Sequence, residues 1–262
     1  MYMEPETIIY VGGFELPDRD AAAHRVVGNA KILKESGYKI FFIDVNRRTN
    51  IDKKSNSKIM KEFDIHSIAF PRTNFEWLKY LTGINHVKEI INSTKNVKVV
   101  ICYNYPSILL YKIQRYCKNR DIRVVSDVTE WYEDKRIIKK IDTFIRMKYL
   151  NKKVDGVICI SSFLDSYYKS FTNTVIVPPL LDRKDDKWNR IISKSNNDII
   201  KLVYSGNPGK HKDKLNIIIE SINEINDSII QFTIVGITKE QYLMYYPEHV
   251  ELLQRQKTKL HF

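Results

Sequence analysis

Short apolar runs rich in Ile and Val place the strongest constraint on how this chain can fold. Within each run polar and apolar residues do not alternate, which is typical of strands that are buried on both faces of a sheet. A longer segment separates each run from the next. The runs in the first part of the chain are Thr7–Val11, Lys39–Val45, Val97–Cys102, Ile122–Ser126, Gly156–Ile160 and Thr174–Val177.

The segments between these runs have helical periodicity. In the first of them, apolar residues recur at spacings of three or four residues, at Ala22, Val26, Ala30 and Leu33. Gly37 then follows as a typical glycine after a helix C-terminus. Similar spacing predicts helices at Trp77–Ile84 and Ile108–Tyr116. Because strands and helices alternate, the sequence predicts a doubly wound parallel α/β sheet.

A polar and charged stretch divides the chain into two predicted domains, residues 1–182 and 199–262. We interpret residues 183–198 as the connection between them, with a short helix around Trp188–Ile192. The strands and helices expected in the second domain are Ile199–Tyr204, Asp213–Glu224, Ile230–Val235, Lys239–Tyr245 and Lys259–Phe262. A sheet with so few strands buries both faces poorly, so we expect an unusually small lobe or a truncated chain.

The charge and the cysteines narrow the class of protein. The formal net charge of +12 favours anionic partners, such as phosphates, nucleic acid or an anionic membrane surface. The three cysteines form no C-x-x-C pair, so we expect a reducing, cytoplasmic compartment. We find neither a secretory signal nor an apolar run long enough to span a membrane. The scattered histidines predict no metal site, and no motif indicates nucleic-acid binding.

The first apolar run ends in Gly12-Gly13, ahead of a long loop and a helix that carries His24 and Arg25. A glycine pair lets the backbone approach a ligand closely, and the N–H groups at the start of the next helix can bind an anion. A tight turn without a ligand is the alternative, because the pattern G-x-G-x-x-G is incomplete.

Carboxylates follow the strand that ends near Ser126. Asp127 and Glu130, with Trp131 next to them, fall at the C-terminal end of a parallel strand, where such sheets bind ligands. The alternatives are that Asp127 caps a loop or a helix and that Trp131 is a packing residue.

The second domain opens with a strand that runs into a glycine loop. Ser205 and Gly206 are followed by Lys210 and Lys212 and then by a predicted helix. Backbone N–H groups and lysines in this arrangement can hold a diphosphate. The sequence lacks the Gly-Lys-Ser/Thr of a P-loop, and a solvated turn is the alternative.

A basic segment at residues 135–153 interleaves lysines and arginines with apolar residues at helical spacing. We expect its apolar face to dock on the sheet. The basic face would then point outward, either to solvent or to anionic lipid headgroups.

Taken in order, these segments resemble a bacterial family 4 glycosyltransferase, a member of the retaining group with the GT-B fold. The resemblance covers nearly the whole chain and implies a complete Rossmann-like N-terminal lobe and a partial second Rossmann-like lobe. The segments that carry it are Val11–Ile40, Ser126–Tyr132, Ile158–Tyr168, Val177–Asp182 and Tyr204–Asp213.

The resemblance implies transfer of a sugar from a nucleotide diphosphate sugar to an acceptor hydroxyl, with retention at the anomeric carbon and with no metal or other cofactor. Asp127 and Glu130 are its candidates for a catalytic role, and the Gly13 N–H and Lys212 would stabilise the leaving diphosphate. The expected diphosphate-binding residues are Gly12, Gly13, Ser205, Gly206, Lys210 and Lys212. The expected acceptor-side residues are His24, Arg25, Glu130 and Trp131.

The acceptor implied by the resemblance is a lipid-linked or growing cell-surface polysaccharide, such as a capsule or exopolysaccharide. A cytoplasmic enzyme bound peripherally to the inner face of the plasma membrane would fit that acceptor and the basic segment.

Two departures from the family are informative. Asn207 takes the place of an arginine, and the glutamates of a Glu-x(7)-Glu signature would follow Phe262. We therefore expect the isolated chain to transfer little or no sugar. The alternatives are an inactive remnant and one subunit of a split enzyme completed by a C-terminal fragment. A nucleic-acid-binding protein is a further alternative that no motif supports.

Overall fold

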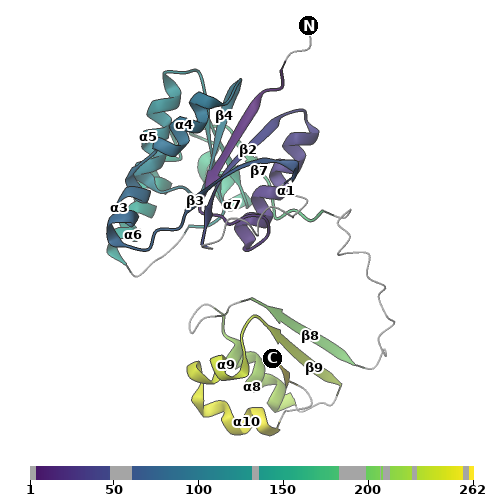
Figure 1. Ribbon diagram of the computed structural model, residues 1–262. Coiled ribbons are helices and arrows are strands. Elements are labelled where there is room, and N and C mark those ends of the chain that lie inside the picture. The colour runs from purple at the N-terminus through teal and green to yellow at the C-terminus, as the bar shows by residue number, and fades with distance from the viewer. Residues whose placement is uncertain are drawn as a thin grey trace. The chain divides into compact units, whose positions relative to one another are not determined.

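The chain forms two compact units, residues 1–185 and 186–262, which Figure 1 shows as ribbons. The computed structural model describes residues 4–47, 61–131, 136–182, 199–206, 208, 213–225, 229–255 and 260–262. The predicted connection at 183–198, and the short helix expected within it, lie outside the described residues.

The larger unit is built on a seven-stranded sheet with the strand order β3-β2-β1-β4-β5-β6-β7. All neighbouring strands are parallel, so every connection has to cross over the sheet. The strands are β1 (Thr7–Gly12), β2 (Lys39–Asn46), β3 (Asp64–Ala69), β4 (Val97–Tyr103), β5 (Arg123–Val128), β6 (Gly156–Cys159) and β7 (Thr174–Ile176).

Helices cover both faces of this sheet, with α1 on one side and α3, α4, α5 and α6 on the other (Figure 1). Because successive strand residues point to opposite faces, Ile8 and Tyr10 belong to the core beside α1, and Ile9 and Val11 belong to the core on the opposite face. The helices are α1 (Ala21–Glu35), α3 (Asn74–Thr82), α4 (Asn85–Ser93), α5 (Ser107–Lys118), α6 (Ile137–Ile145), a π-helix (Arg146–Leu150) and α7 (Ser162–Tyr168).

The fold class predicted from the sequence is confirmed, and burial of both sheet faces explains the continuous apolar runs. The sequence reasoning missed β3, because this edge strand is partly exposed and contains the polar residues Asp64, His66 and Ser67. It also predicted one helix in the region of Trp77, where the chain forms α3 and α4 with Gly83 between them.

The prediction that the apolar face of the basic segment at 135–153 docks on the sheet is wrong. The apolar residues of α6 face outward rather than onto the sheet, and Ile138 is 81% exposed. Arg146, expected on the basic outer face, is buried. A polar contact explains this orientation, because Asp142 of α6 accepts hydrogen bonds from the Ser107 backbone N (2.8 Å) and Oγ (2.7 Å) at the start of α5.

The smaller unit has a three-stranded parallel sheet with the order β10-β9-β8. Ile219 and Phe232 lie in its core, and Tyr242 is fully buried beside His249, to which its hydroxyl is hydrogen-bonded at 2.8 Å. Its elements are β8 (Ile200–Ser205), α8 (Leu215–Ile225), β9 (Ile230–Val235), α9 (Lys239–Tyr245), a 3₁₀ helix (Pro247–His249), α10 (Val250–Arg255) and β10 (Leu260–His261).

A buried polar network joins the centre of the larger sheet to α1. The Arg25 guanidinium contacts both carboxylate oxygens of Asp127 near the end of β5, and its Nη2 lies 2.8 Å from Oδ1. The Tyr10 hydroxyl and the Asn29 amide both donate to Asp127 Oδ2. Burial raises the pKa of the Asp127 carboxyl, and the Arg25 charge and the hydrogen bonds oppose that rise.

The same helix holds the segment that leaves the sheet after β7. Arg25 Nη1 donates to the carbonyl of Val177 at 2.8 Å, and Lys31 forms an ion pair with Asp182 at 2.5 Å. Between these two positions, a Cβ atom on Gly28 would lie 3.3 Å from Leu180 Cβ, so residues 25, 28 and 31, three apart along α1, follow residues 177–182.

We predict that Asp127→Asn destabilises the larger unit by about 3–5 kcal/mol, because it leaves the buried Arg25 guanidinium without its counter-charge. Urea unfolding followed by circular dichroism measures the change. The control is Asp64→Asn, which breaks an exposed pair with Lys39 and should leave the unfolding midpoint nearly unchanged. If Asp127→Asn were as stable as this control, the ion pair between Asp127 and Arg25 would not contribute to the stability of the fold.

Candidate functional site

The strand order reverses direction between β1 and β4, and the candidate site is at the C-terminal ends of these two strands. These strands are neighbours, but the chain turns to opposite faces of the sheet after them, and ligands of open α/β sheets bind at such a point. Three loops meet at this edge. They contain Gly13 after β1, which ends at Gly12, Asn104 after β4, and Thr129 and Glu130 after β5.

The two glycines of the first loop have different surroundings. Gly12 is buried, and a Cβ atom there would lie 2.8 Å from Tyr103 Cβ and 2.9 Å from the Tyr103 carbonyl oxygen. Gly13 is exposed, and the nearest atom to a Cβ there would be the Tyr80 hydroxyl at 4.0 Å. Glycine is therefore needed at position 12 for packing, and at position 13 it leaves the backbone open to a ligand.

Asn104 braces the edge of the sheet, and the sequence reasoning missed it. Its backbone has a φ of 41°, in the left-handed region that asparagine tolerates better than most residues. Its Oδ1 accepts from the Thr129 backbone N at 3.2 Å, and its Nδ2 donates to Thr129 Oγ1 at 2.5 Å. The sequence feature that could have pointed to Asn104 is its place directly after a buried strand.

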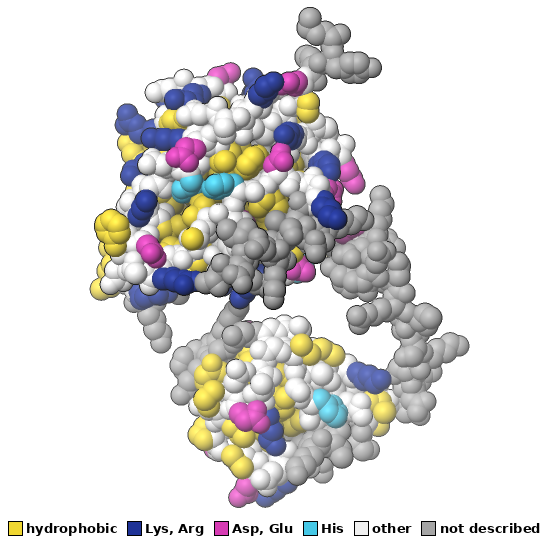
Figure 2. Space-filling model, in the orientation of Figure 1, with side chains coloured by type: hydrophobic (Ala, Val, Ile, Leu, Met, Phe, Trp, Pro, Cys, Tyr) yellow, Lys and Arg dark blue, Asp and Glu magenta, His cyan; other side chains and the backbone are white. Residues whose placement is uncertain are grey.

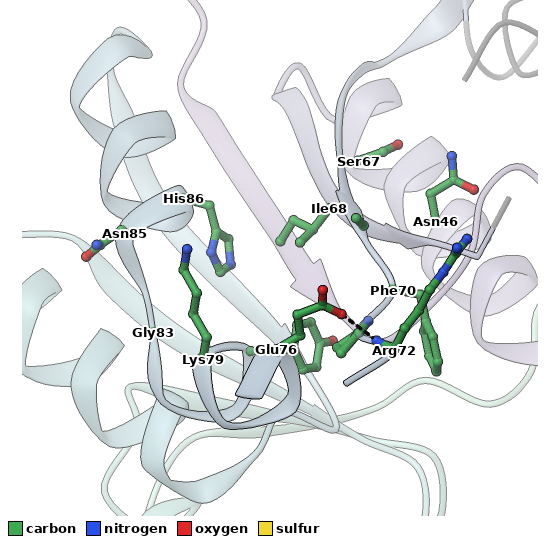
Figure 3. A pocket seen from close by; sticks show the side chains of 13 residues that line it. Asn46, Ser67, Ile68, Phe70, Arg72, Glu76, Lys79, Gly83, Asn85 and His86 are labelled. Carbon is green, nitrogen blue, oxygen red and sulfur yellow. Dashed lines mark hydrogen bonds between the residues drawn. The ribbon is translucent and has the colours of Figure 1, made fainter. Parts of the chain in front are cut away.

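A cavity of about 690 Å³ opens beside this edge, at the ends of β2 and β3. Figure 3 shows Lys79 and His86 on one side of it and Ser67 and Asn46 on the other. Tyr80, which lies next to Gly13, also lines the cavity, so the cavity adjoins the glycine loop. The sequence reasoning missed this cavity, because it found neither β3 nor the break between α3 and α4.

The cavity offers cations and one neutral imidazole. Arg72 and Lys79 are exposed on its wall, and Glu76 accepts hydrogen bonds from the backbone N–H groups of Arg72 and Thr73, which lower the pKa of its carboxyl. Burial lowers the pKa of His86 to about 4, and its Nε2 has no hydrogen-bond partner among the described residues. These groups suit a polar ligand that carries hydroxyl or anionic groups.

The structure does not gather the predicted acceptor-side residues into one group. Arg25 and Asp127 are buried in the network described above, whereas His24 and Glu130 are exposed. Trp131 is half-buried, with its ring 5.2 Å from that of Tyr167. Of the two carboxylates predicted for a catalytic role, Glu130 is the one that solvent reaches, because Asp127 has no exposed surface.

In the smaller unit, Ser205 and Gly206 lie at the C-terminal end of β8, as predicted. Gly206 N donates to the Val235 carbonyl at 2.9 Å, and a Cβ on Gly236 would lie 2.1 Å from the Gly206 carbonyl oxygen. These contacts bring the ends of β8 and β9 close together. Lys210 and Lys212 lie outside the described residues.

The fold is that of known nucleotide-sugar proteins. LpCGTa in complex with UDP is 12% identical, with a TM-score of 0.60 over 98% of this chain and 70% of that one. UGT2 of Phytolacca americana, complexed with UDP-2-fluoroglucose and pterostilbene, is 10% identical, with a TM-score of 0.59 over 100% and 71% of the chains. The UDP-GlcNAc 2-epimerase of Methanocaldococcus jannaschii is 12% identical, with a TM-score of 0.56 over 97% and 72%.

Comparison of the sequence with family models and with curated proteins gives no match. The structural likeness, together with the two parallel sheets, shows that the chain has a GT-B-like fold, with a complete Rossmann-like N-terminal lobe and a smaller, partial second one.

We predict that Gly12→Ala destabilises the larger unit by about 1–3 kcal/mol, because the added methyl group overlaps the backbone of β4. Gly13→Ala is the matched control and should unfold like the wild type. Thermal unfolding of both variants, followed by circular dichroism, makes the comparison. Equal losses in the two variants would contradict the packing role assigned to Gly12.

We also predict that His86 makes the folding stability of the larger unit sensitive to acid. Its pKa in the folded protein, about 4, lies below the ordinary value of 6.5, so the unfolded chain takes up a proton first. Stability from this group is present above pH 6.5 and is lost as the pH falls through about 4.

The variant His86→Gln should lose less stability on acidification than the wild type. We expect a difference of roughly 1–2 kcal/mol, allowing for solvent screening of a half-buried ring. Urea midpoints measured across this pH range test the prediction, with the exposed His24→Gln as control. An unchanged pH profile in His86→Gln would refute it.

Proposed function

We propose that this chain binds a nucleotide diphosphate sugar and takes part in transferring its sugar to an acceptor. The observation that carries the proposal is the pairing of a GT-B-like fold with glycine loops at the C-terminal ends of β1 and β8. LpCGTa was solved with UDP and the Phytolacca protein with UDP-2-fluoroglucose, which supports a UDP-sugar as the donor.

The donor diphosphate is assigned to the smaller unit, at Ser205, Gly206 and the two lysines Lys210 and Lys212. The exposed Ser205 supports this assignment, since hydroxyl and ammonium groups both donate hydrogen bonds to a diphosphate. In the larger unit, we propose that the Gly13 N–H contacts an anionic group of a bound ligand, because Gly13 leaves its backbone accessible.

The acceptor is assigned to the larger unit, in the cavity beside Gly13. Its hydroxyl-binding groups and exposed cations suit a sugar or a sugar phosphate. Glu130 is exposed in the loop after β5, and we propose it as the catalytic candidate in preference to the buried Asp127. Membership of family 4, retention at the anomeric carbon and a cell-surface polysaccharide acceptor remain parts of this proposal.

Completion of the smaller unit by a further strand is a second part of the proposal. Among the described strands, β8 lies at the edge of its sheet and exposes Ile200, Leu202 and Val203. An apolar, unpaired strand edge favours pairing with another strand. We therefore propose that a complementary fragment supplies this strand, and that the isolated chain binds nucleotide with little turnover.

We predict that isothermal titration calorimetry detects binding of UDP to this chain, and that Lys212→Ala weakens it by about tenfold or more, because a charge-assisted hydrogen bond to phosphate is lost. The control is Lys201→Ala, at the opposite end of β8, which makes the same change in charge. Absence of UDP binding, or equal weakening by both variants, would rule out the assigned donor site. Release of UDP from a panel of UDP-sugars measures turnover separately.

A further inference from the structure

Three adjacent helices of the larger unit expose large apolar side chains to solvent. Within α3, α5 and α6, each of these side chains is at least a third exposed, and Phe75 and Ile138 reach 76% and 81%. Figure 2 shows hydrophobic side chains at the left edge of this unit, where Figure 1 places α3 and α6. Trp77 of α3 is also exposed but packs against Phe70 and Tyr80. We call the others the outer apolar surface; it comprises Phe75, Leu78, Leu81, Ile108, Tyr111, Ile137, Ile138, Ile141, Phe144 and Ile145.

Specific contacts hold these helices next to one another. Asp142 of α6 accepts from the Ser107 backbone N and Oγ at the start of α5, and Lys112 of α5 donates to the Thr82 carbonyl at the end of α3 at 2.5 Å. The core side of α5 is occupied by Leu109 and its buried neighbours. The exposed residues therefore belong to helices that are already packed, and exposed apolar patches of this kind mark sites of interaction.

The exposed charge of the three helices is mainly positive. The acidic residues of the three helices are Glu76 and Asp142, and both accept hydrogen bonds from backbone N–H groups at helix starts. Helices α5 and α6 expose basic side chains, namely Lys112, Arg115, Lys118, Lys139 and Lys140. A cationic rim around an apolar centre is complementary to an anionic lipid surface, where lysines meet phosphates and apolar side chains enter the headgroup region.

We propose that this surface binds an anionic membrane, with the Ile, Leu and Phe side chains of α3, α5 and α6 inserted into the interface. The mode is interfacial, and among the described residues no helix is long and apolar enough to cross a bilayer. This differs from the sequence expectation, in which the basic face of α6 alone would touch lipid.

The position of α3 gives the surface a consequence for the reaction. Phe75 and Leu78 belong to the outer apolar surface, whereas Glu76, Lys79 and Tyr80 of the same helix line the cavity. If the proposed function holds, a lipid-linked acceptor in the bound membrane would therefore lie close to the cavity. Membrane binding itself does not depend on that function and is tested without any substrate.

The first experiment is co-sedimentation of the full chain with phosphatidylcholine vesicles, with and without phosphatidylglycerol. We expect strong binding only with the anionic lipid, and a loss of about tenfold or more in Ile138→Ser/Ile141→Ser, because interfacial burial of two isoleucines is removed. Both residues are exposed in the free protein, so the variant should fold normally. The matched control is Ile217→Ser/Ile218→Ser, an exposed isoleucine pair on α8 of the smaller unit.

The charged rim is tested in the same assay. Lys139→Glu/Lys140→Glu should lower binding to anionic vesicles by about tenfold or more, since each basic residue near an anionic surface contributes measurably. Equal binding to neutral and anionic vesicles would overturn the proposal, and so would full binding by the double-serine variant.

A second measurement separates insertion from loose electrostatic adsorption. The native cysteines Cys102, Cys117 and Cys159 are buried, so Ile138→Cys can be labelled selectively with an environment-sensitive dye. The dye emission should rise and shift to the blue on addition of anionic vesicles, whereas a dye at Lys201→Cys should not respond.

Protein–protein contact is the competing outcome. A dimer in sedimentation velocity that Ile138→Ser/Ile141→Ser dissociates, without vesicle binding by the wild type, would assign the surface to a second copy and refute the membrane proposal.

Discussion

The buried pair of Asp127 and Arg25 is the interaction on which the arrangement of the larger unit depends. A carboxylate without solvent contact is unfavourable unless it is paired, and here a guanidinium, a phenol and an amide all contact it. These groups come from β1, α1 and β5, so the pair can form only when the helix lies in one position on the sheet. Through Val177 the same guanidinium also places the segment that leaves the sheet.

Structural and functional demands are separated along the C-terminal edge of the sheet. The charged side chains of Asp127 and Arg25 are buried in an ion pair that stabilises the fold, so they are not available to a ligand. Groups that remain accessible are of another kind: the open backbone of Gly13, the exposed Glu130 and the polar wall of the neighbouring cavity. Under the proposed function, a site of this composition would bind and orient a ligand, which is what transfer from an already activated sugar donor requires.

Helix α3 connects the two surfaces for which we propose ligands. Its capping box, formed by Thr73 and Glu76, fixes the start of the helix, and its residues then divide between the cavity and the outer apolar surface. Such a division follows from the helical repeat, because residues three and four apart share a face. In α6, Asp142 is hydrogen-bonded to Ser107, and the isoleucines of that helix lie on the same outer side of the unit.

The sequence by itself determined the fold class, because strands buried on both faces must be apolar throughout, and this pattern is local. It also indicated that Gly12-Gly13 and Ser205-Gly206 lie at the C-terminal ends of β1 and β8. Glycine is typical of such places because it allows the backbone to approach other atoms closely. Only the tertiary structure decided that Asp127 is buried against Arg25, a contact between residues 102 positions apart. The cavity beside β3 and the outward face of α6 were likewise decided by packing, because a short polar edge strand and an inverted amphipathic helix have no distinct local pattern.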